Sequence, residues 1–199
     1  MRKFAFVPAA CTVLVLATLA RAQHVDIAIG AGTLFSSKNR TASLGYLPPA
    51  EKGGSYPSVS ITRIFSNRFG YSGEVAVRSK RELYNSYQAY RPILYDLNAV
   101  FAPHLAKRIN ADFMAGIGGE RVLFYNPSGN CNFPSGCNTH FDSNHFLFHV
   151  SADIRYTVWR RFFVRPEAHL YRIVNNTTDF HSDNVLRVGA SVGYTFGGQ

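Results

Sequence analysis

The sequence predicts an all-β fold, an eight-stranded antiparallel up-and-down β-barrel that crosses a membrane with its strands. Three observations predict it. Apolar and polar side chains alternate with a period of two in eight segments, and the connections between these segments alternate in length. No stretch after Gln23 approaches the roughly 18 consecutive apolar residues that suggest a membrane-spanning helix.

Composition excludes two other classes of protein. The chain has 199 residues, enough for one domain of moderate size, and 46% of them are hydrophobic. This apolar content, without any low-complexity tract, excludes a disordered chain. Only 17% of the residues are charged and 14% are aromatic. Ala, Leu, Glu and Lys do not dominate, so a helical bundle is not expected.

The first 22 residues have the pattern of a secretory signal peptide. Arg2 and Lys3 precede the apolar stretch Phe4–Leu19, and Ala20-Arg21-Ala22 forms a cleavage motif before Gln23. The alternative, a retained membrane anchor, would need roughly 20 apolar residues. We therefore expect residues 1–22 to be removed and residues 23–199 to form one outer-membrane barrel domain.

The basic excess does not indicate nucleic-acid binding. The formal net charge is +9, and loss of the signal peptide would lower it to +6. The remaining basic residues are scattered, and only three pairs are adjacent, at Lys80-Arg81, Lys107-Arg108 and Arg160-Arg161. No face or run concentrates the charge, so we expect no nucleic-acid partner.

Eight segments carry the alternation. The clearest three last about ten residues, longer than the five or six typical of strands in soluble proteins. Pro166 interrupts the seventh segment, where a local bulge is expected. The eight segments are Val25–Gly32, Ser58–Thr62, Phe69–Arg78, Ile93–Phe101, Ile109–Gly119, Phe146–Tyr156, Val164–Tyr171 and Leu186–Phe196.

The connections are long and short in turn. With the N-terminus inside, all the longer ones fall on one side, as in barrels with short periplasmic turns and longer outer loops. The short connections lie around residues 66–68, 103–107 and 158–161. The longer ones are expected at residues 36–54, 79–87, 126–144 and 175–184.

The apolar face is expected to point outward, towards lipid. The opposite face is rich in Gly, Ser and Thr with single charges, and small residues fit the crowded interior of an eight-stranded barrel. A soluble, lipocalin-like barrel would instead need a charged exterior. Aromatic residues cluster at the strand ends, which predicts two belts at the headgroup layers. Those near the longer loops include Tyr84, Tyr90, Phe124 and Phe146, and those near the short turns include Phe65, Phe101, Trp159 and Phe162.

Two cysteines remain after the signal peptide, in the connection at residues 126–144. Cys131 and Cys137 enclose Pro134 and Gly136, which can turn so short a loop back on itself. An exported protein with two nearby cysteines most simply pairs them, so we expect a disulfide. Two thiols alone make a poor zinc site.

The predicted inner face carries seven acidic and four basic residues. Isolated charges in so narrow a barrel would be costly, so they should pair or hold water. We expect an arginine-centred ion-pair network that plugs the lumen and blocks continuous conduction. Its predicted members are Asp26, Glu74, Arg78, Asp153, Arg155, Arg165, Glu167 and Arg187.

One pattern suggests chemistry. His149-Val150-Ser151 resembles the His-x-Ser arrangement of outer-membrane lipid A deacylases, and Glu167 on the next strand could orient the histidine. A deacylase needs its nucleophile towards lipid, whereas this face carries Asp153 and points into the barrel. A polar pair in the lumen is therefore expected, with no catalytic site, cofactor or metal.

The whole mature chain resembles the small bacterial outer-membrane β-barrels, the OmpA-like family of eight-stranded transmembrane domains. The resemblance rests on the signal sequence, the alternation of loop lengths and the final segment Leu186–Phe196. It implies export through the Sec pathway and residence in the bacterial outer membrane. It also implies that periplasmic chaperones and the barrel-assembly machinery, which reads the closing strand, are partners. Tyr194 and Phe196 are the closing aromatics, although Gly197-Gly198-Gln199 follow them.

Two classes of function remain open. The first is a structural or surface-interaction barrel, adhesin-like, that contacts outer-membrane lipid and uses its outer loops as binding elements. The alternative is a narrow pore or, with less support, a lipid-acting enzyme. Eight strands leave an interior that side chains can fill, which disfavours the pore. The sequence names no ligand for the loops.

Overall fold

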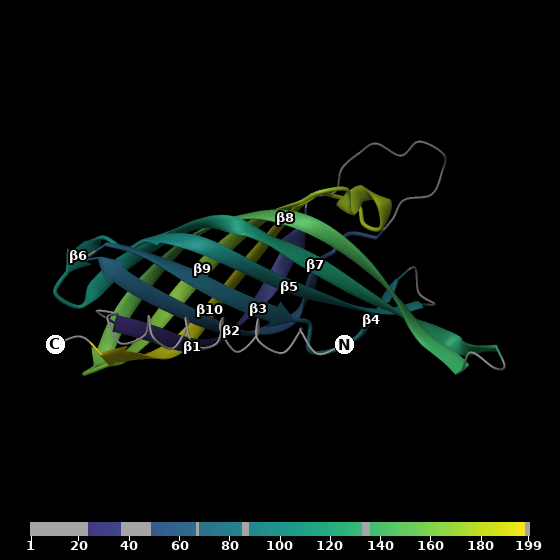
Figure 1. The fold of residues 1–199 in the computed structure, drawn as a ribbon, viewed down its shortest axis with the longest axis horizontal. Helices are drawn as coiled ribbons and strands as arrows, with labels where there is room; N and C mark the ends of the chain where they lie inside the picture. Colours follow the sequence, from purple (N-terminus) through teal and green to yellow (C-terminus); the bar gives the residue numbers. More distant parts are fainter. Residues whose placement is uncertain (1–23, 37–48, 67, 85–87, 133–135, 198–199) are drawn as a thin grey trace, which may run out of the picture.

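The computed structural model describes residues 24–36, 49–66, 68–84, 88–132 and 136–197. The predicted signal peptide lies outside these residues. Nearly all of the described chain is strand, and Figure 1 shows the strands tilted around a common axis. The long strands are β1 (His24–Ser36), β2 (Gly53–Ser66), β3 (Phe69–Val77), β5 (Gln88–Phe101), β7 (Ile109–Asn132), β8 (Gly136–Trp159), β9 (Phe162–Ile173) and β10 (Asn184–Gly197). The shorter elements are β4 (Glu82–Tyr84), β6 (His104–Ala106) and the 3₁₀ turn η1 (Asn176–Thr178).

The sheet closes on itself. Each long strand pairs antiparallel with its neighbours in the chain, β5 pairs with β7, and β1 closes the ring against β10. The closing ladder runs from His24 opposite Gly197 to Ser36 opposite Val185. This confirms the predicted closed, eight-stranded antiparallel barrel. The short β4 pairs with one end of β5, and the short β6 pairs with one end of β7, at the barrel rims.

Side-chain direction follows the predicted alternation. Along β5, Leu94 and Asp96 are buried inside the barrel, whereas Tyr95, Leu97 and Phe101 are exposed on its outer wall. The other long strands likewise place Ile, Val, Leu and aromatic side chains outside. A continuous apolar exterior of this kind needs lipid to cover it. Among the described residues, no helix is long and apolar enough to cross a membrane.

The outer connection at residues 126–144 differs from the expectation of a loop. Strands β7 and β8 continue through most of it as a hairpin that projects beyond the barrel (Figure 1). The ladder shifts register between Tyr125 and Asn130 and then resumes from Asn130 opposite Asn138. The prediction was wrong because this polar segment lacks apolar alternation. Pairing between two chain-adjacent strands forms the ladder without an apolar face.

Two smaller expectations were also wrong. Pro166 causes no bulge, because the register of β9 against β8 and against β10 is unchanged across it. Its side chain faces outward. The ladder between β8 and β9 lacks pairs at this position, because proline has no N–H to donate. Tyr90 and Phe124 were predicted in an aromatic belt, but both turn inward and are buried at the outer mouth.

Strands β5 and β7 approach closely where glycine faces the interior. A Cβ added to Gly118 would lie 2.0 Å from the carbonyl oxygen of Tyr95, and one on Gly116 would lie 2.0 Å from that of Leu97. Real Cβ atoms do not approach backbone so closely, and backbone cannot move aside as a flexible side chain can. Glycine at these two positions lets the β5–β7 ladder close the barrel.

Candidate functional site

A completely buried arginine occupies the centre of the lumen. Arg187 on β10 forms ion pairs with Glu74 on β3 and Glu167 on β9, the latter at 3.5 Å. The ring of Tyr171 lies 6.0 Å from the guanidinium carbon. One cation therefore links three strands across the barrel interior.

A second arginine extends this group towards the short turns. Arg165 Nε lies 3.4 Å from Glu167 Oε2 and donates to Ser191 Oγ at 3.2 Å. Its Nη2 donates to Ser60 Oγ at 3.0 Å, and Ser191 Oγ donates to Glu167 Oε2 at 3.0 Å. Arg165 thus ties β9 to β2 on the far side of the barrel.

A third arginine forms a separate group nearer the short turns. Arg155 on β8 pairs with Asp26 on β1 and lies 3.9 Å from Asp112 on β7. Thr195 Oγ1 donates to Asp26 Oδ1 at 2.6 Å. These contacts join the first and last strands of the barrel to its middle strands.

Two of the eight predicted network residues lie apart from these groups. Arg78 sits at the outer mouth, pairs with Glu82 of β4 and donates to Tyr56 OH at 3.5 Å. Asp153 is buried in the lumen, but it has no hydrogen bond or ion pair within the described chain. The structure thus brings together Asp26 with Arg155, and Glu74 with Arg165, Glu167 and Arg187.

A stack of aromatic rings fills the lumen beside Arg187. The rings of His149 and His169 are stacked with centroids 5.1 Å apart, and Tyr171 stacks on His149 at 4.8 Å. His149 Nε2 and His169 Nδ1 are 3.0 Å apart, and His149 Nδ1 lies 2.7 Å from Asn98 Oδ1. Both ring nitrogens of His149 therefore contact polar groups inside the lumen. Ser151 Oγ, also in the lumen, has no hydrogen-bond partner in the described residues.

Three potential metal ligands meet in the same place. Ligand atoms of Glu74, Glu167 and His169 lie within 4.8 Å of one another. The guanidinium of Arg187 already contacts both carboxylates, so it holds the position that a metal ion would take. This arrangement does not fit a metal site.

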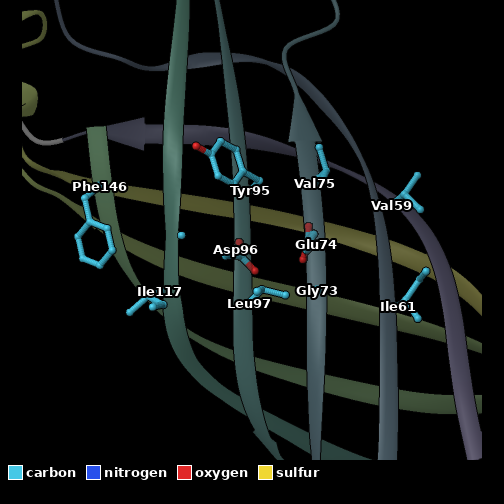
Figure 2. A pocket seen from close by; sticks show the side chains of 11 residues that line it. Val59, Ile61, Gly73, Glu74, Val75, Tyr95, Asp96, Leu97, Ile117 and Phe146 are labelled. Atoms are coloured by element: carbon cyan, nitrogen blue, oxygen red, sulfur yellow. The ribbon is translucent and has the colours of Figure 1, made fainter. Parts of the chain in front are cut away.

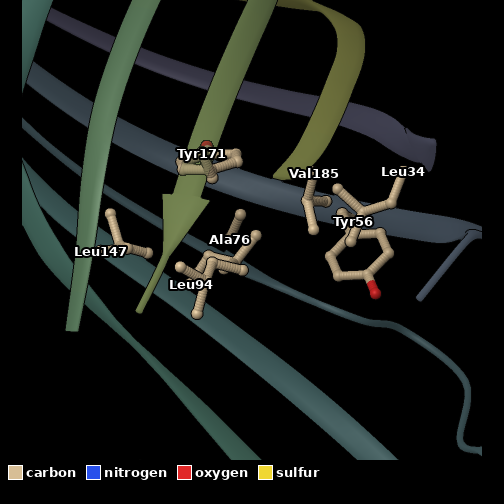
Figure 3. Close-up of a cluster of buried hydrophobic side chains, with 8 residues drawn as sticks. Leu34, Tyr56, Ala76, Leu94, Leu147, Tyr171 and Val185 are labelled. Carbon is tan, nitrogen blue, oxygen red and sulfur yellow. The ribbon is translucent and has the colours of Figure 1, made fainter. Parts of the chain in front are cut away.

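Apolar layers lie on both sides of the charged centre. The layer towards the outer mouth contains Leu94 of β5 and Tyr171 of β9, and Figure 3 shows both among the side chains of this layer. A smaller cluster of Ile64, Val100 and Met114, with Ala102, lies towards the short turns. The other members of the outer layer are Leu34, Tyr56, Ala76, Leu147, Ile173 and Val185. These layers were not predicted, although paired apolar residues such as Leu34-Phe35 are visible in the sequence.

The outer mouth is covered by the segment between β9 and β10. Phe180 is completely buried there and packs on Tyr90 at 5.3 Å and on Tyr84 at 6.0 Å between ring centroids. Tyr84 OH donates to the carbonyl oxygen of Asp179 at 2.5 Å. The backbone N–H of His181 donates to Pro49 O at 3.2 Å. This segment therefore caps the aromatic cluster and joins the chain that precedes β2.

A groove of about 660 Å³ runs along the outer wall over β2, β3, β5 and β7. Figure 2 shows apolar side chains such as Val59 and Leu97 around it, with Gly73 in its floor. Gly73 has no side chain to fill this part of the wall. The groove lies on the lipid-facing wall, so its apolar lining suits a lipid acyl chain.

The predicted disulfide lies at the end of the projecting hairpin. The structure pairs Cys131 of β7 directly with Cys137 of β8. Directly opposed residues of an antiparallel pair have Cα atoms 4.5–5.5 Å apart in general, which a disulfide can span. The side chains lie outside the described part of the structure, so the bond itself stays a prediction.

The closing-strand aromatics stand at the short-turn end of β10. Tyr194 packs edge-on against Phe162 at 4.9 Å and against Phe196 at 4.7 Å between ring centroids. Phe196 pairs with Val25 of β1 in the closing ladder and is exposed on the outer wall. Both rings thus lie on the lipid-facing end of the strand, as a headgroup belt requires.

A basic depression of about 420 Å³ lies at the outer rim. Arg78, Lys80 and Arg81 line it together with Glu82 and the backbone around Gly54. Lys80 and Arg81 are exposed, and the guanidinium carbon of Arg81 lies 3.6 Å from the centroid of the Tyr125 ring. Two exposed basic side chains in one depression can bind an anion.

The closed ring, the apolar exterior and the filled polar lumen define the fold of the small outer-membrane β-barrels. Neither a family model nor a curated protein sequence matches the chain. The solved structures nevertheless give the same fold.

Three solved barrels illustrate the likeness. Neisserial surface protein A is 12% identical with a TM-score of 0.60, over 87% of this chain and 96% of that one. The N-terminal barrel of OprF from Pseudomonas aeruginosa is 11% identical with a TM-score of 0.59, over 88% and 98%. Ail, the attachment invasion locus protein of Yersinia pestis, solved with the heparin analogue sucrose octasulfate, is 12% identical with a TM-score of 0.58, over 87% and 98%.

Proposed function

We propose that the protein is an integral barrel of the bacterial outer membrane that acts through its outer surface and not through a pore. The layered filling of the lumen is the observation that carries this proposal. Apolar layers lie on both sides of the Arg187 ion-pair group, while the large apolar side chains of the wall face outward. The lipid-covered wall anchors the barrel, and the projecting β7–β8 hairpin and neighbouring loops are its binding elements.

The folded protein is expected to show no stable conductance in planar lipid bilayers at neutral pH. Ions would have to displace both apolar layers and the arginine-centred pairs, because side chains fill an eight-stranded barrel. Single-channel recording of detergent-refolded protein checks this, with heat-modifiability on gels as the control for folding. A large, stable conductance would overturn the closed-lumen proposal and favour the pore.

The basic depression favours an anionic saccharide, sulfated or phosphorylated, as the surface ligand. Sulfate and phosphate groups accept several hydrogen bonds from Arg and Lys, and Arg81 and Lys80 offer such donors at the rim. Ail was solved with a polysulfated sugar, which makes that sugar a suitable probe here.

Charge reversal at the rim tests this ligand class. The double substitution Lys80→Glu with Arg81→Glu is expected to weaken sucrose octasulfate binding about a hundredfold or more, since each of the two lost contacts to an anion contributes about 1.5–3 kcal/mol. Titration calorimetry at two salt concentrations measures it. The matched control is Arg160→Glu with Arg161→Glu, the basic pair on the short turn between β8 and β9. Equal losses in both variants would indicate a non-specific charge effect and contradict the proposed site.

Catalysis does not form part of the proposal. His149 and Ser151 face the lumen, and both side chains of the candidate pair are closed off from the bilayer. Glu167, the residue that would orient the histidine, is engaged by Arg165 and Arg187. Export through the Sec pathway, periplasmic chaperones and the barrel-assembly machinery would deliver such a barrel to the membrane.

A further inference from the structure

Two carboxyl groups lie close together in the outer mouth. Glu51 lies just before β2 and Glu120 lies on β7, and both side chains are completely buried. The two groups are within hydrogen-bonding reach of each other. None of their four oxygens has a hydrogen-bond partner among the described residues. Buried ionised carboxylates are very unfavourable unless something positive compensates them.

The side-chain amide of Asn176, from a third segment, adds a neutral group to the two carboxyls. The side chain of Asn176, in η1, is completely buried and lies against Glu51. Its Nδ2 donates to Ser182 O at 2.9 Å, and its Oδ1 has no hydrogen-bond partner within the described chain. Three segments distant in sequence thus bring four unpartnered carboxylate oxygens and the amide of Asn176 into one buried place.

The two positive neighbours of Glu51, Arg78 and His145, are each already paired with another carboxylate. The charge of Arg78 acts on Glu51, but Arg78 forms an ion pair with Glu82. His145, opposite Glu120 in the ladder, lies 2.8 Å from Asp179 through its Nε2, and Asp179 adds a further negative charge near Glu120. Burial raises the pKa of Glu51 to about 7. A carboxyl with this pKa ionises readily at neutral pH when a cation is offered.

We propose that a divalent cation of the oxygen-preferring kind, Ca²⁺ or Mg²⁺, binds between Glu51, Glu120 and Asn176. Carboxylate and amide oxygens are the ligands that these ions prefer, and water completes their coordination. Two negative charges match the charge of the ion. The site goes beyond the surface-binding proposal, because it lies inside the mouth and uses none of the exposed residues of the basic depression.

The bound cation would fasten the outer segments to the barrel. Glu51 belongs to the segment before β2, Asn176 to the segment after β9, and Glu120 to the wall. A hydrogen bond from His181 N to Pro49 O already joins the segment after β9 to the segment before β2. Shared coordination by all three would hold Phe180 and its neighbours closed over the aromatic cluster.

The competing occupant of the site is a proton shared by the two carboxyls. The pKa of Glu51 is raised in the folded state. Without a cation, the stabilisation that the shared proton gives is therefore present at low pH and is lost as pH rises through about 7. A cation has the opposite dependence, because its ligands must be deprotonated. Stabilisation by Ca²⁺ is therefore expected to increase from about pH 6 to about pH 8.

Terbium luminescence provides a direct test on detergent-refolded protein that is free of lipopolysaccharide and has been treated with EDTA. Tyr56 and Tyr90 lie close enough to interact electrostatically with both carboxyls, so excitation of tyrosine can sensitise a bound Tb³⁺. We expect a saturable signal that Ca²⁺ displaces. Glu120→Gln should weaken Tb³⁺ binding about tenfold or more. Asp142→Asn, which removes an exposed carboxylate paired with Arg121 on the same hairpin, should leave it unchanged.

Urea unfolding with and without Ca²⁺ gives the second readout. The parent is expected to unfold at a higher urea midpoint with Ca²⁺ than with EDTA, whereas Glu51→Gln with Glu120→Gln should fold and show no difference. Absence of a saturable Tb³⁺ signal, or equal binding by the Glu120→Gln variant, would overturn the proposal. Stability that depends on pH but not on Ca²⁺ would assign the pair to the shared proton instead.

Discussion

Replacement of Arg187 by Met is expected to destabilise the barrel by about 3–5 kcal/mol, the usual effect of removing one partner of a buried ion pair. Met keeps much of the side-chain length but leaves Glu74 and Glu167 without their shared cation. Water solvates these carboxylates poorly, because both are buried and apolar layers lie on either side of them. Urea unfolding in detergent, followed by fluorescence of Trp159, the only tryptophan, measures the loss.

Removal of both partners is the control for this prediction. The double variant Glu74→Gln with Arg187→Met should lose less than the sum of the single losses, since neither charge is left unpaired. The same cycle on Arg165 and Glu167 measures their 3.4 Å pair. Additive losses in both cycles, or a loss for Arg187→Met below about 1 kcal/mol, would contradict an arginine-centred network.

Replacement of Leu97 by Arg should destabilise the folded barrel by about 2–4 kcal/mol in a lipid bilayer. Leu97 is 71% exposed on the outer wall, and it is the middle one of five outward positions on β5 from Ile93 to Phe101. A guanidinium at this depth must lie in hydrocarbon or bend far towards a headgroup. Reversible unfolding from phospholipid vesicles measures the difference.

Leu105→Arg is the matched control on the same protein. Leu105 lies in β6, at the short-turn rim, and is 62% exposed. The same substitution near an interface should cost only about 0–1 kcal/mol, because the charge reaches the headgroups. Equal losses at both positions would show that the wall at Leu97 does not face the centre of a bilayer.

The barrel itself could be predicted because backbone geometry fixes side-chain direction. Successive residues of a strand face opposite sides, so the alternation from Leu186 to Phe196 already separates the wall from the lumen. Inward placement of Arg155, Arg165 and Arg187 follows from the same period. Which strands carry the neighbours of each charge also follows from the strand order, since β1 must meet β10 in a closed ring.

The detailed pairing could not be predicted, because it depends on register between distant strands. Arg187 meets Glu74 across 113 positions of sequence, and a shift of two residues on one strand would separate them. Arg78 follows β3 and reaches Glu82 of β4, an element too short to show a period. The apolar layers were missed for a related reason. Where a strand is apolar on both faces, as at Phe146-Leu147-Phe148, alternation does not reveal that one face fills the lumen.

The carboxyl pair in the mouth lies further beyond sequence reasoning. Glu120 has the inward parity of β7, but Glu51 and Asn176 belong to connections without any period. Their meeting depends on how two outer segments fold back over the barrel. Only the full three-dimensional arrangement places these oxygens together.

The β7–β8 hairpin also changes how far the protein extends from the membrane. Seven positions of β7, from Asn126 to Asn132, continue in strand conformation past Tyr125, which pairs with Ala89, the last residue of β5 to pair with β7. At about 3.3 Å per residue this arm is roughly 23 Å long. Within the described chain, β9 pairs with β8 only from Leu147 onward, so the distal part of β8 has no strand on its outer edge. The arm therefore offers an extended macromolecule a main-chain edge to pair with, well above the headgroups.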